Sequence, residues 1–160
     1  MSLVTVIDAS ENGKYLVIAI FSVEESRVNM VFQEVRGWIK HSKKLGKRKA
    51  KYYQAFEQRF PRIKELAHYS NAFRVKKTSR AKEFPRSFWN ALDMLVNSSS
   101  LIIVDDKLVR VISRRYPSST IIAEGKVNKS KKQLLIMALL ADNIANYVRL
   151  YGDYDLIRKG

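Results

Sequence analysis

Apolar residues dominate two short segments near the start of the chain. Residues 3–10 (LVTVIDAS) and 14–23 (KYLVIAIFSV) are rich in Val and Ile, which favours β-strands. Between them, Asn12 and Gly13 form a pair that is typical of a tight turn with positive φ angles. We therefore predict that the fold opens with an antiparallel β-hairpin.

Farther along the chain, apolar residues recur at helical spacing in some segments and form short continuous runs in others. Continuous runs predict strands at 69–78, 100–107 and 119–126, and residues 107–117 form a short helix or an extended segment. Helices that alternate with strands predict one α/β domain over residues 1–160, whose mixed sheet opens with the hairpin and is flanked by helices. The first two predicted helices span residues 24–41 and 50–67, the second with an interruption at Pro61. A third runs from about Pro85 to residue 98, and the last runs from a cap at Asn128 or Ser130 to Gly152.

Acidic residues stand where several of these apolar elements end. Asp8 is near the end of the first strand, and Asp105 and Asp106 follow LIIV. Glu124 follows TIIA, whereas Asp142 lies inside the apolar final helix. If they meet, these carboxylates form a cluster that needs shared protons or bound cations. Oxygen ligands favour Mg²⁺ or Mn²⁺, which support phosphodiester hydrolysis, so the five acids are predicted to form a metal site.

The acids at the strand ends also have simpler structural interpretations. Asp8 could belong to a turn, and Asp105 or Asp106 could cap a following helix. Glu124 could belong to a turn at Gly125.

Asp142 has a simpler interpretation of its own. On a helical wheel it falls at the edge of a polar arc that includes Asn143 and Asn146, so it could be solvated. The small neighbours Ala138 and Ala145 would also let the end of a sheet approach it. The functional interpretation of Asp142 therefore depends on whether the other acids meet it.

The chain carries 30 Lys and Arg against 15 Asp and Glu, a formal net charge of +15. The cations gather in residues 36–51 and 74–86, with a third group at 126–132. Such clusters neutralise phosphates and release counterions, so they predict nucleic-acid binding, with a solvated cationic surface as the alternative. The predicted nucleic-acid-binding residues are Lys43, Lys44, Lys47, Arg48, Lys49, Lys51, Arg74, Lys76, Lys77 and Arg80.

Other features exclude several classes of protein. Without cysteine the chain has no disulfide, thiol catalysis or cysteine-ligated zinc, which fits a reducing cytoplasm. His41 and His68 lack metal-ligand spacing, and the scattered glycines form no phosphate-binding loop. No signal peptide is evident, and the longest apolar run, LLIMALLA, is far shorter than the roughly 20 residues that span a bilayer. We expect a cytoplasmic protein that binds no membrane.

The short motifs TVIDAS, LIIVDD and LLADNIANYVR together resemble ribonuclease H-like proteins. More narrowly, they resemble the uncharacterised family called domain of unknown function 3800. Members of that family tend to open with a strand ending in Asp and to close with a helix that contains an Ala-Asp pair. The resemblance implies a ribonuclease H-like sheet and a metal-dependent acid cluster, whose acids would be Asp8, Asp105 (or Asp106) and Asp142.

The sequence departs from this family pattern in two places. Ala9 stands where the family usually has Glu, and here the first Glu comes at Glu11. The ribonuclease H acid of the first helix has Glu34 as its candidate.

Three functions are consistent with the sequence. The first is a Mg²⁺- or Mn²⁺-dependent nuclease with Asp8, Asp105 and Asp142 as catalytic residues. The alternatives are a non-catalytic basic nucleic-acid-binding module on the same fold and an interaction protein for an acidic partner.

Overall fold

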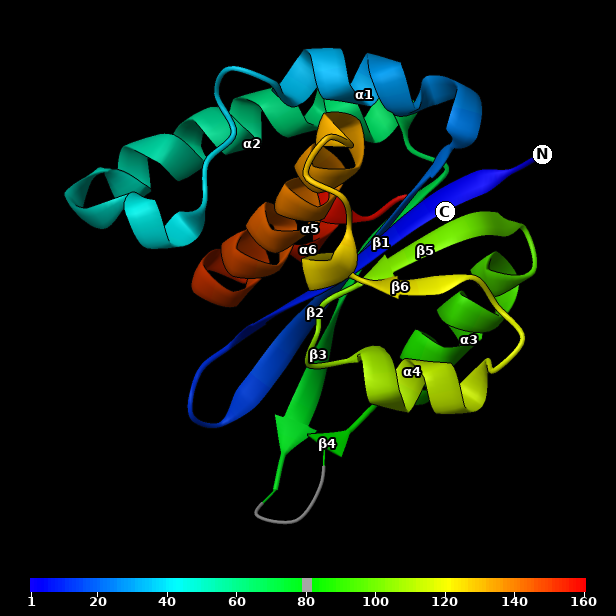
Figure 1. The fold of residues 1–160 in the computed structure, drawn as a ribbon. Coiled ribbons are helices and arrows are strands. Elements are labelled where there is room, and N and C mark those ends of the chain that lie inside the picture. The colour runs from blue at the N-terminus through cyan, green and yellow to red at the C-terminus, as the bar shows by residue number, and fades with distance from the viewer. Residues whose placement is uncertain (79–81) are drawn as a thin grey trace.

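A mixed six-stranded sheet forms the centre of the computed structural model, which describes residues 1–78 and 82–160 (Figure 1). Its strands are β1 (Leu3–Glu11), β2 (Tyr15–Glu24), β3 (Tyr69–Lys77), β4 (Lys82–Glu83), β5 (Ser99–Val104) and β6 (Ile121–Ala123). Their order across the sheet is β4-β3-β2-β1-β5-β6. The pairs from β1 to β4 are antiparallel, whereas β5 runs parallel to both β1 and β6. The predicted mixed α/β sheet that opens with a hairpin is confirmed.

Helices cover both faces of this sheet. They are α1 (Val28–Val35), α2 (Lys49–Leu66), α3 (Arg86–Val96), α4 (Val109–Arg115), α5 (Lys132–Tyr151) and α6 (Tyr154–Ile157). One face carries α5 with α1 and α2 over it, and the other carries α3 and α4 (Figure 1). On β1, Val4 and Val6 belong to the core under α5, whereas Leu3 and Ile7 belong to the opposite core. Because side chains alternate along a strand, Asp8 and Ser10 belong to the α5 face.

The helix α5 is the central element of its layer. It packs on β1 and β2 and contacts α1, and most of its residues from Met137 to Val148 are buried. Ala138, Ala141 and Ala145 are almost completely buried and keep the helix close to the sheet. Among the described residues, α5 alone is long and apolar enough to span a membrane, and burial in this core accounts for that apolarity.

The hairpin turn forms by a different mechanism from the predicted one. Neither Asn12 nor Gly13 has a positive φ angle. Instead, the side-chain oxygen of Asn12 accepts hydrogen bonds from the amides of Lys14 (2.8 Å) and Tyr15 (3.0 Å). The prediction of a hairpin is correct, but an Asx-type turn with a longer loop replaces the two-residue turn.

Two predicted helix boundaries and one predicted interruption also differ from the structure. The first helix ends at Val35 rather than near 41, and Gly37 follows with a φ angle of +89°. The second helix runs through Pro61 without interruption. The final helix begins after Lys131, which makes no side-chain cap, so neither predicted cap residue is used. Its predicted end at Gly152 is correct, with a left-handed φ of +69°.

We predict that Ala145→Leu destabilises the fold by about 1–3 kcal/mol, because the fully buried Ala145 leaves no room for a larger side chain between α5 and the sheet. The measurement is urea unfolding followed by circular dichroism. The control is Ala50→Leu at an exposed position of α2, where the expected change is within about 0.5 kcal/mol. Equal effects of the two substitutions would show that α5 does not approach the sheet closely.

Candidate active site

The parallel strands bring three of the predicted acids into one row. The last residue pair between β1 and β5 directly precedes Asp8 and Asp105, and the last pair between β5 and β6 directly precedes Asp105 and Glu124. Each acid also lies two residues after a side chain that packs in or against the core under α5. Those preceding side chains are Val6, Ile103 and Ile122. Strand alternation therefore directs all three acids to the α5 face, where Asp142 also lies.

Asp8 and Asp105 form a buried carboxyl pair. The amide of Ala9 donates to Asp8 Oδ1 at 2.9 Å and also lies 3.3 Å from Asp105 Oδ2, so the two groups are side by side. Burial, the hydrogen bond to Asp105 and the charges of neighbouring acids raise the pKa of Asp8 to about 10. At neutral pH the protonated Asp8 therefore donates a hydrogen bond to the Asp105 carboxylate.

Asp105 is the ionised member of the pair. Burial acts to raise its pKa, but the hydrogen bonds from Asp8 and from the amides of Lys107 and Ala9 outweigh burial and lower that pKa. The amide of Lys107 donates to Asp105 Oδ1 at 3.1 Å. The predicted alternative for Asp105, a cap on the following helix, is not observed, because α4 begins after Leu108 without a side-chain cap, and Asp105 instead accepts from the turn before it.

Glu124 and Asp142 complete the set of coupled acids. Burial, followed by the charges of Asp105 and Asp142, raises the pKa of Glu124. Burial also raises the pKa of Asp142, although His41 and Asn146 oppose this shift. Asp142 Oδ1 accepts a hydrogen bond from Asn146 Nδ2 at 3.0 Å, whereas Oδ2 is buried without a hydrogen-bond partner. Asp142 is therefore not the solvated surface acid of the simpler interpretation.

The remaining candidate acids have other partners. Asp106 is exposed, and its Oδ1 accepts a hydrogen bond from the Gly125 amide at 3.0 Å. A Cβ at Gly125 would lie 2.7 Å from Asp106 Oδ2, so a larger residue at position 125 would displace the Asp106 carboxylate. Glu34 forms an ion pair with Arg62 of α2 at 3.9 Å. Of the two central acids, Asp105 is the one that meets Asp8.

A divalent cation is the ligand that this donor set fits by its chemistry. All four coupled groups offer carboxyl oxygens, Asp8 holds a proton that a cation could replace, and Asp142 has an unsatisfied buried oxygen. Within the described parts of the chain, however, no three His, Cys, Asp or Glu side chains form a ready-made metal-binding group. Binding would therefore require deprotonation of Asp8 and movement of side chains.

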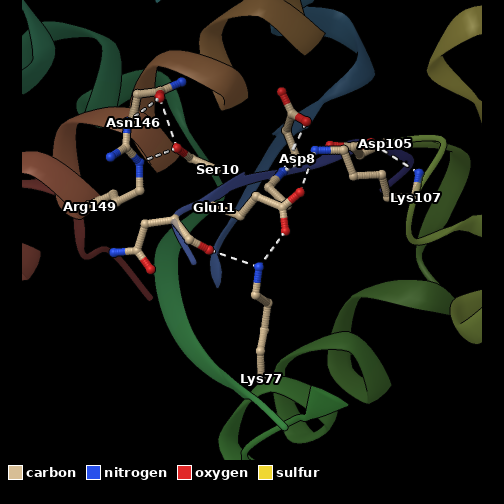
Figure 2. A network of polar contacts seen from close by, with 10 residues as sticks. Asp8, Ser10, Glu11, Lys77, Asp105, Lys107, Asn146 and Arg149 are labelled. Carbon is tan, nitrogen blue, oxygen red and sulfur yellow. Dashed lines mark hydrogen bonds and ion pairs between the residues drawn. The ribbon is translucent and has the colours of Figure 1, made fainter. Parts of the chain in front are cut away.

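Asp142 lines a polar cavity of about 410 Å³, whereas Asp105, Asp106 and Glu124 line a separate cavity of about 550 Å³. In the wall of the first cavity, Ser10, Asn146 and Arg149 form a hydrogen-bonded network (Figure 2). Lys43 and Lys49 in the lining of this cavity are among the predicted nucleic-acid-binding residues. Apart from Asp142, the other polar and charged lining residues were not predicted to bind a ligand, although Asn146 and Arg149 follow Asp142 at the helical spacings of four and seven. They are Ser10, Glu11, Ser42, Lys107, Asn146 and Arg149.

The other predicted nucleic-acid-binding residues do not gather around this cavity. Three of them line a separate cavity of about 300 Å³ beside Tyr52, namely Lys44, Arg48 and Lys51. On β3, Arg74 packs over the ring of Tyr15, and Lys77 donates to Glu11 and to the Asn12 carbonyl. Lys47 and Lys76 are exposed, and Arg80 lies outside the described residues.

Comparison with solved structures defines the class of fold. The chain is similar to Bst-RNase HIII in complex with Mn²⁺, with a TM-score of 0.53 and 20% identity, covering 93% of this chain and 52% of that one. A mutant of Bst-RNase HIII gives a TM-score of 0.54 and 19% identity, covering 92% and 51%. The ribonuclease H2 from Pyrococcus horikoshii OT3 gives 0.46 and 17%, covering 94% and 78%. The fold is therefore ribonuclease H-like, and the chain spans about half the length of Bst-RNase HIII.

Sequence comparisons add no closer assignment. No protein-family model and no curated protein matches the chain. The narrower resemblance to domain of unknown function 3800 therefore stays a prediction.

We predict that Asp8→Asn stabilises the metal-free protein by about 2–4 kcal/mol at pH 7. The folded-state pKa of Asp8, about 10, lies above the ordinary value of 3.8. The contribution of Asp8 to wild-type stability is therefore greatest below pH 3.8 and falls as the pH rises towards 10, because ionisation of Asp8 favours the unfolded chain. Asparagine cannot ionise, so the difference in unfolding free energy between Asp8→Asn and the wild type should shrink towards zero near pH 4.

The measurement is urea unfolding in EDTA at pH 4 and pH 7. Asp155→Asn, at a side chain that is 91% exposed, is the matched control and should change stability little at either pH. An Asp8→Asn effect that is the same at both pH values would contradict the buried carboxyl pair.

Proposed function

We propose that this chain is a metal-dependent nuclease that hydrolyses phosphodiester bonds of RNA or DNA. Asp8, Asp105 and Asp142 would hold Mg²⁺ or Mn²⁺, with Glu124 as a supporting acid. Bound cations would supply the positive charge that hydrolysis needs at the attacking and leaving oxygens. Asp106 would support the turn that carries Glu124, through its hydrogen bond to Gly125.

The observation that carries this proposal is the buried pair of Asp8 and Asp105 at the carboxyl ends of adjacent parallel strands. Burial beside Asp105 raises the pKa of Asp8, so the Asp8 side chain weakens the fold at neutral pH and packing alone does not explain the pair. A strongly shifted acid beside a cavity is typical of a functional site. The ribonuclease H-like fold supports the proposal, since Bst-RNase HIII has been crystallised with Mn²⁺.

The cationic residues around the acids suit a phosphate-bearing substrate. Lys43, Lys49 and Lys107 line the cavity that Asp142 borders. They would hold the phosphates of a nucleic-acid strand and so place a phosphodiester near the acid row. Lys107 is also 3.4 Å from Glu11, so it is positioned at the edge of the site before substrate binds.

We predict that the wild-type protein cleaves an RNA, DNA or hybrid oligonucleotide only with Mg²⁺ or Mn²⁺. Asp8→Asn, Asp105→Asn and Asp142→Asn should each lower the rate by at least about 100-fold, since each removes charge needed at the reacting centre. The measurement is cleavage of labelled oligonucleotides on gels, with circular dichroism to confirm folding. Asp155→Asn should keep full activity, and full activity of Asp8→Asn would refute the assignment.

A second prediction tests the metal site without catalysis. Mn²⁺ at 100 times its dissociation constant should stabilise the wild-type protein by about 2.7 kcal/mol, because it binds the folded state alone. Asp8→Asn and Asp142→Asn should lose this gain in a thermal-unfolding experiment, whereas Asp155→Asn should retain it. Equal stabilisation of all four proteins would place the metal elsewhere.

One specific observation favours the non-catalytic alternative. The described residues hold no ready-made group of three metal ligands, and Ala9 supplies no carboxylate beside Asp8. A nucleic-acid-binding module would show steep salt-dependent binding without metal-dependent cleavage or Mn²⁺ stabilisation. An interaction protein for an acidic partner would bind no oligonucleotide at physiological salt.

A further inference from the structure

Arg149 is a half-buried cation held by neutral groups. Its Nε donates to Ser10 Oγ at 2.6 Å, and its Nη2 donates to Asn146 Oδ1 at 3.3 Å (Figure 2). Among the residues that the structure describes, no carboxylate forms an ion pair with it. A guanidinium has five N–H groups, so most of its donors remain for a ligand.

Asn146 fixes the arginine and the candidate metal ligand Asp142 on one face of α5. Its Nδ2 donates to the carbonyl of Asp142 (2.8 Å) and to Asp142 Oδ1 (3.0 Å). Its Oδ1 accepts from Ser10 (2.8 Å) and from Arg149. Only with Nδ2 towards Asp142 and Oδ1 towards Ser10 and Arg149 can the amide group make all of these hydrogen bonds. Asn146 therefore sets the position of Arg149 relative to Asp142.

The cavity that contains Arg149 has an excess of positive charge. Four cations and two acids are among its lining residues. One of the acids, Glu11, is already paired with Lys77 at 2.9 Å and with Lys107 at 3.4 Å. The other, Asp142, faces the metal-binding row. A concave site with these cations and the Ser10 hydroxyl suits an anion with several oxygens, such as a phosphate.

We infer that this cavity binds a backbone phosphate of the nucleic-acid strand, next to the phosphodiester at the acid row. Arg149 contacts that phosphate, and Ser10 and Asn146 are positioning residues for the guanidinium. This subsite deepens the proposed nuclease function and rests on it for the identity of the strand. It assigns roles to residues of α5 beyond the metal-binding acids.

The test is oligonucleotide binding in EDTA, measured by fluorescence anisotropy over a range of KCl concentrations. Arg149→Gln should weaken binding and reduce the slope of log K against log salt by about 1, the value for one lost phosphate contact. Arg149→Lys should keep the slope but bind more weakly, because lysine lacks the planar fork that contacts Ser10 and Asn146.

Arg27→Gln is the matched control, since Arg27 is exposed and follows the end of β2 that pairs with the start of β1. It should leave the slope and affinity nearly unchanged. If Arg149→Gln behaves like Arg27→Gln, or if the wild type binds no oligonucleotide, the inference is wrong. Inorganic phosphate is the second probe: a thermal shift with phosphate but no oligonucleotide binding would assign the cavity to free phosphate and also overturn the inference.

This experiment uses no metal and measures no turnover, so the two proposals fail separately. Binding that depends on Arg149 in a protein without metal-dependent cleavage would retain the subsite and reject the nuclease. Metal-dependent cleavage by a protein whose oligonucleotide affinity does not depend on Arg149 would retain the nuclease and reject the subsite.

Discussion

The parallel pairing of β5 with β1 and β6 is the constraint on which the candidate site depends. This register brings Asp8, Asp105 and Glu124 to the carboxyl ends of three neighbouring strands and to the face that α5 covers. A shift of one residue in either pairing would turn the side chains of a strand to the opposite face and separate the acids. The register is itself set by burial, since the residues before the acids alternate between two apolar cores. The packing of the two cores therefore also determines where the acids lie.

The site combines an acidic centre with cationic surroundings in a chain of net charge +15. The carboxyl groups are buried close enough to shift one another's pKa values, which weakens the fold at neutral pH. A bound cation would relieve that repulsion, and the lysines and Arg149 around the cavity would attract a polyanion to the same place. Under the proposed function the two charge distributions would serve different ligands and are therefore compatible.

Much of the fold could be predicted from the sequence, because strand runs and helical spacing reflect burial directly. The opening hairpin, the mixed sheet and the end of α5 at Gly152 follow from such patterns. The candidate acids were recognisable because they stand at the ends of apolar runs. Helix boundaries and turn type were less predictable, since a glycine after Val35 and a side-chain bond from Asn12 decide them locally. The network of Ser10, Asn146 and Arg149 depends on a contact between β1 and α5, which spacing within either element cannot reveal.

The most direct test of the metal-dependent site is anomalous X-ray diffraction from crystals grown with Mn²⁺. The account predicts an anomalous peak at the carboxyl ends of β1 and β5, with oxygen ligands from Asp8, Asp105 and Asp142. Asp8 would be deprotonated, and the buried Oδ2 of Asp142 would coordinate the ion. At saturating Mn²⁺, the absence of any peak between these three carboxylates would contradict the account.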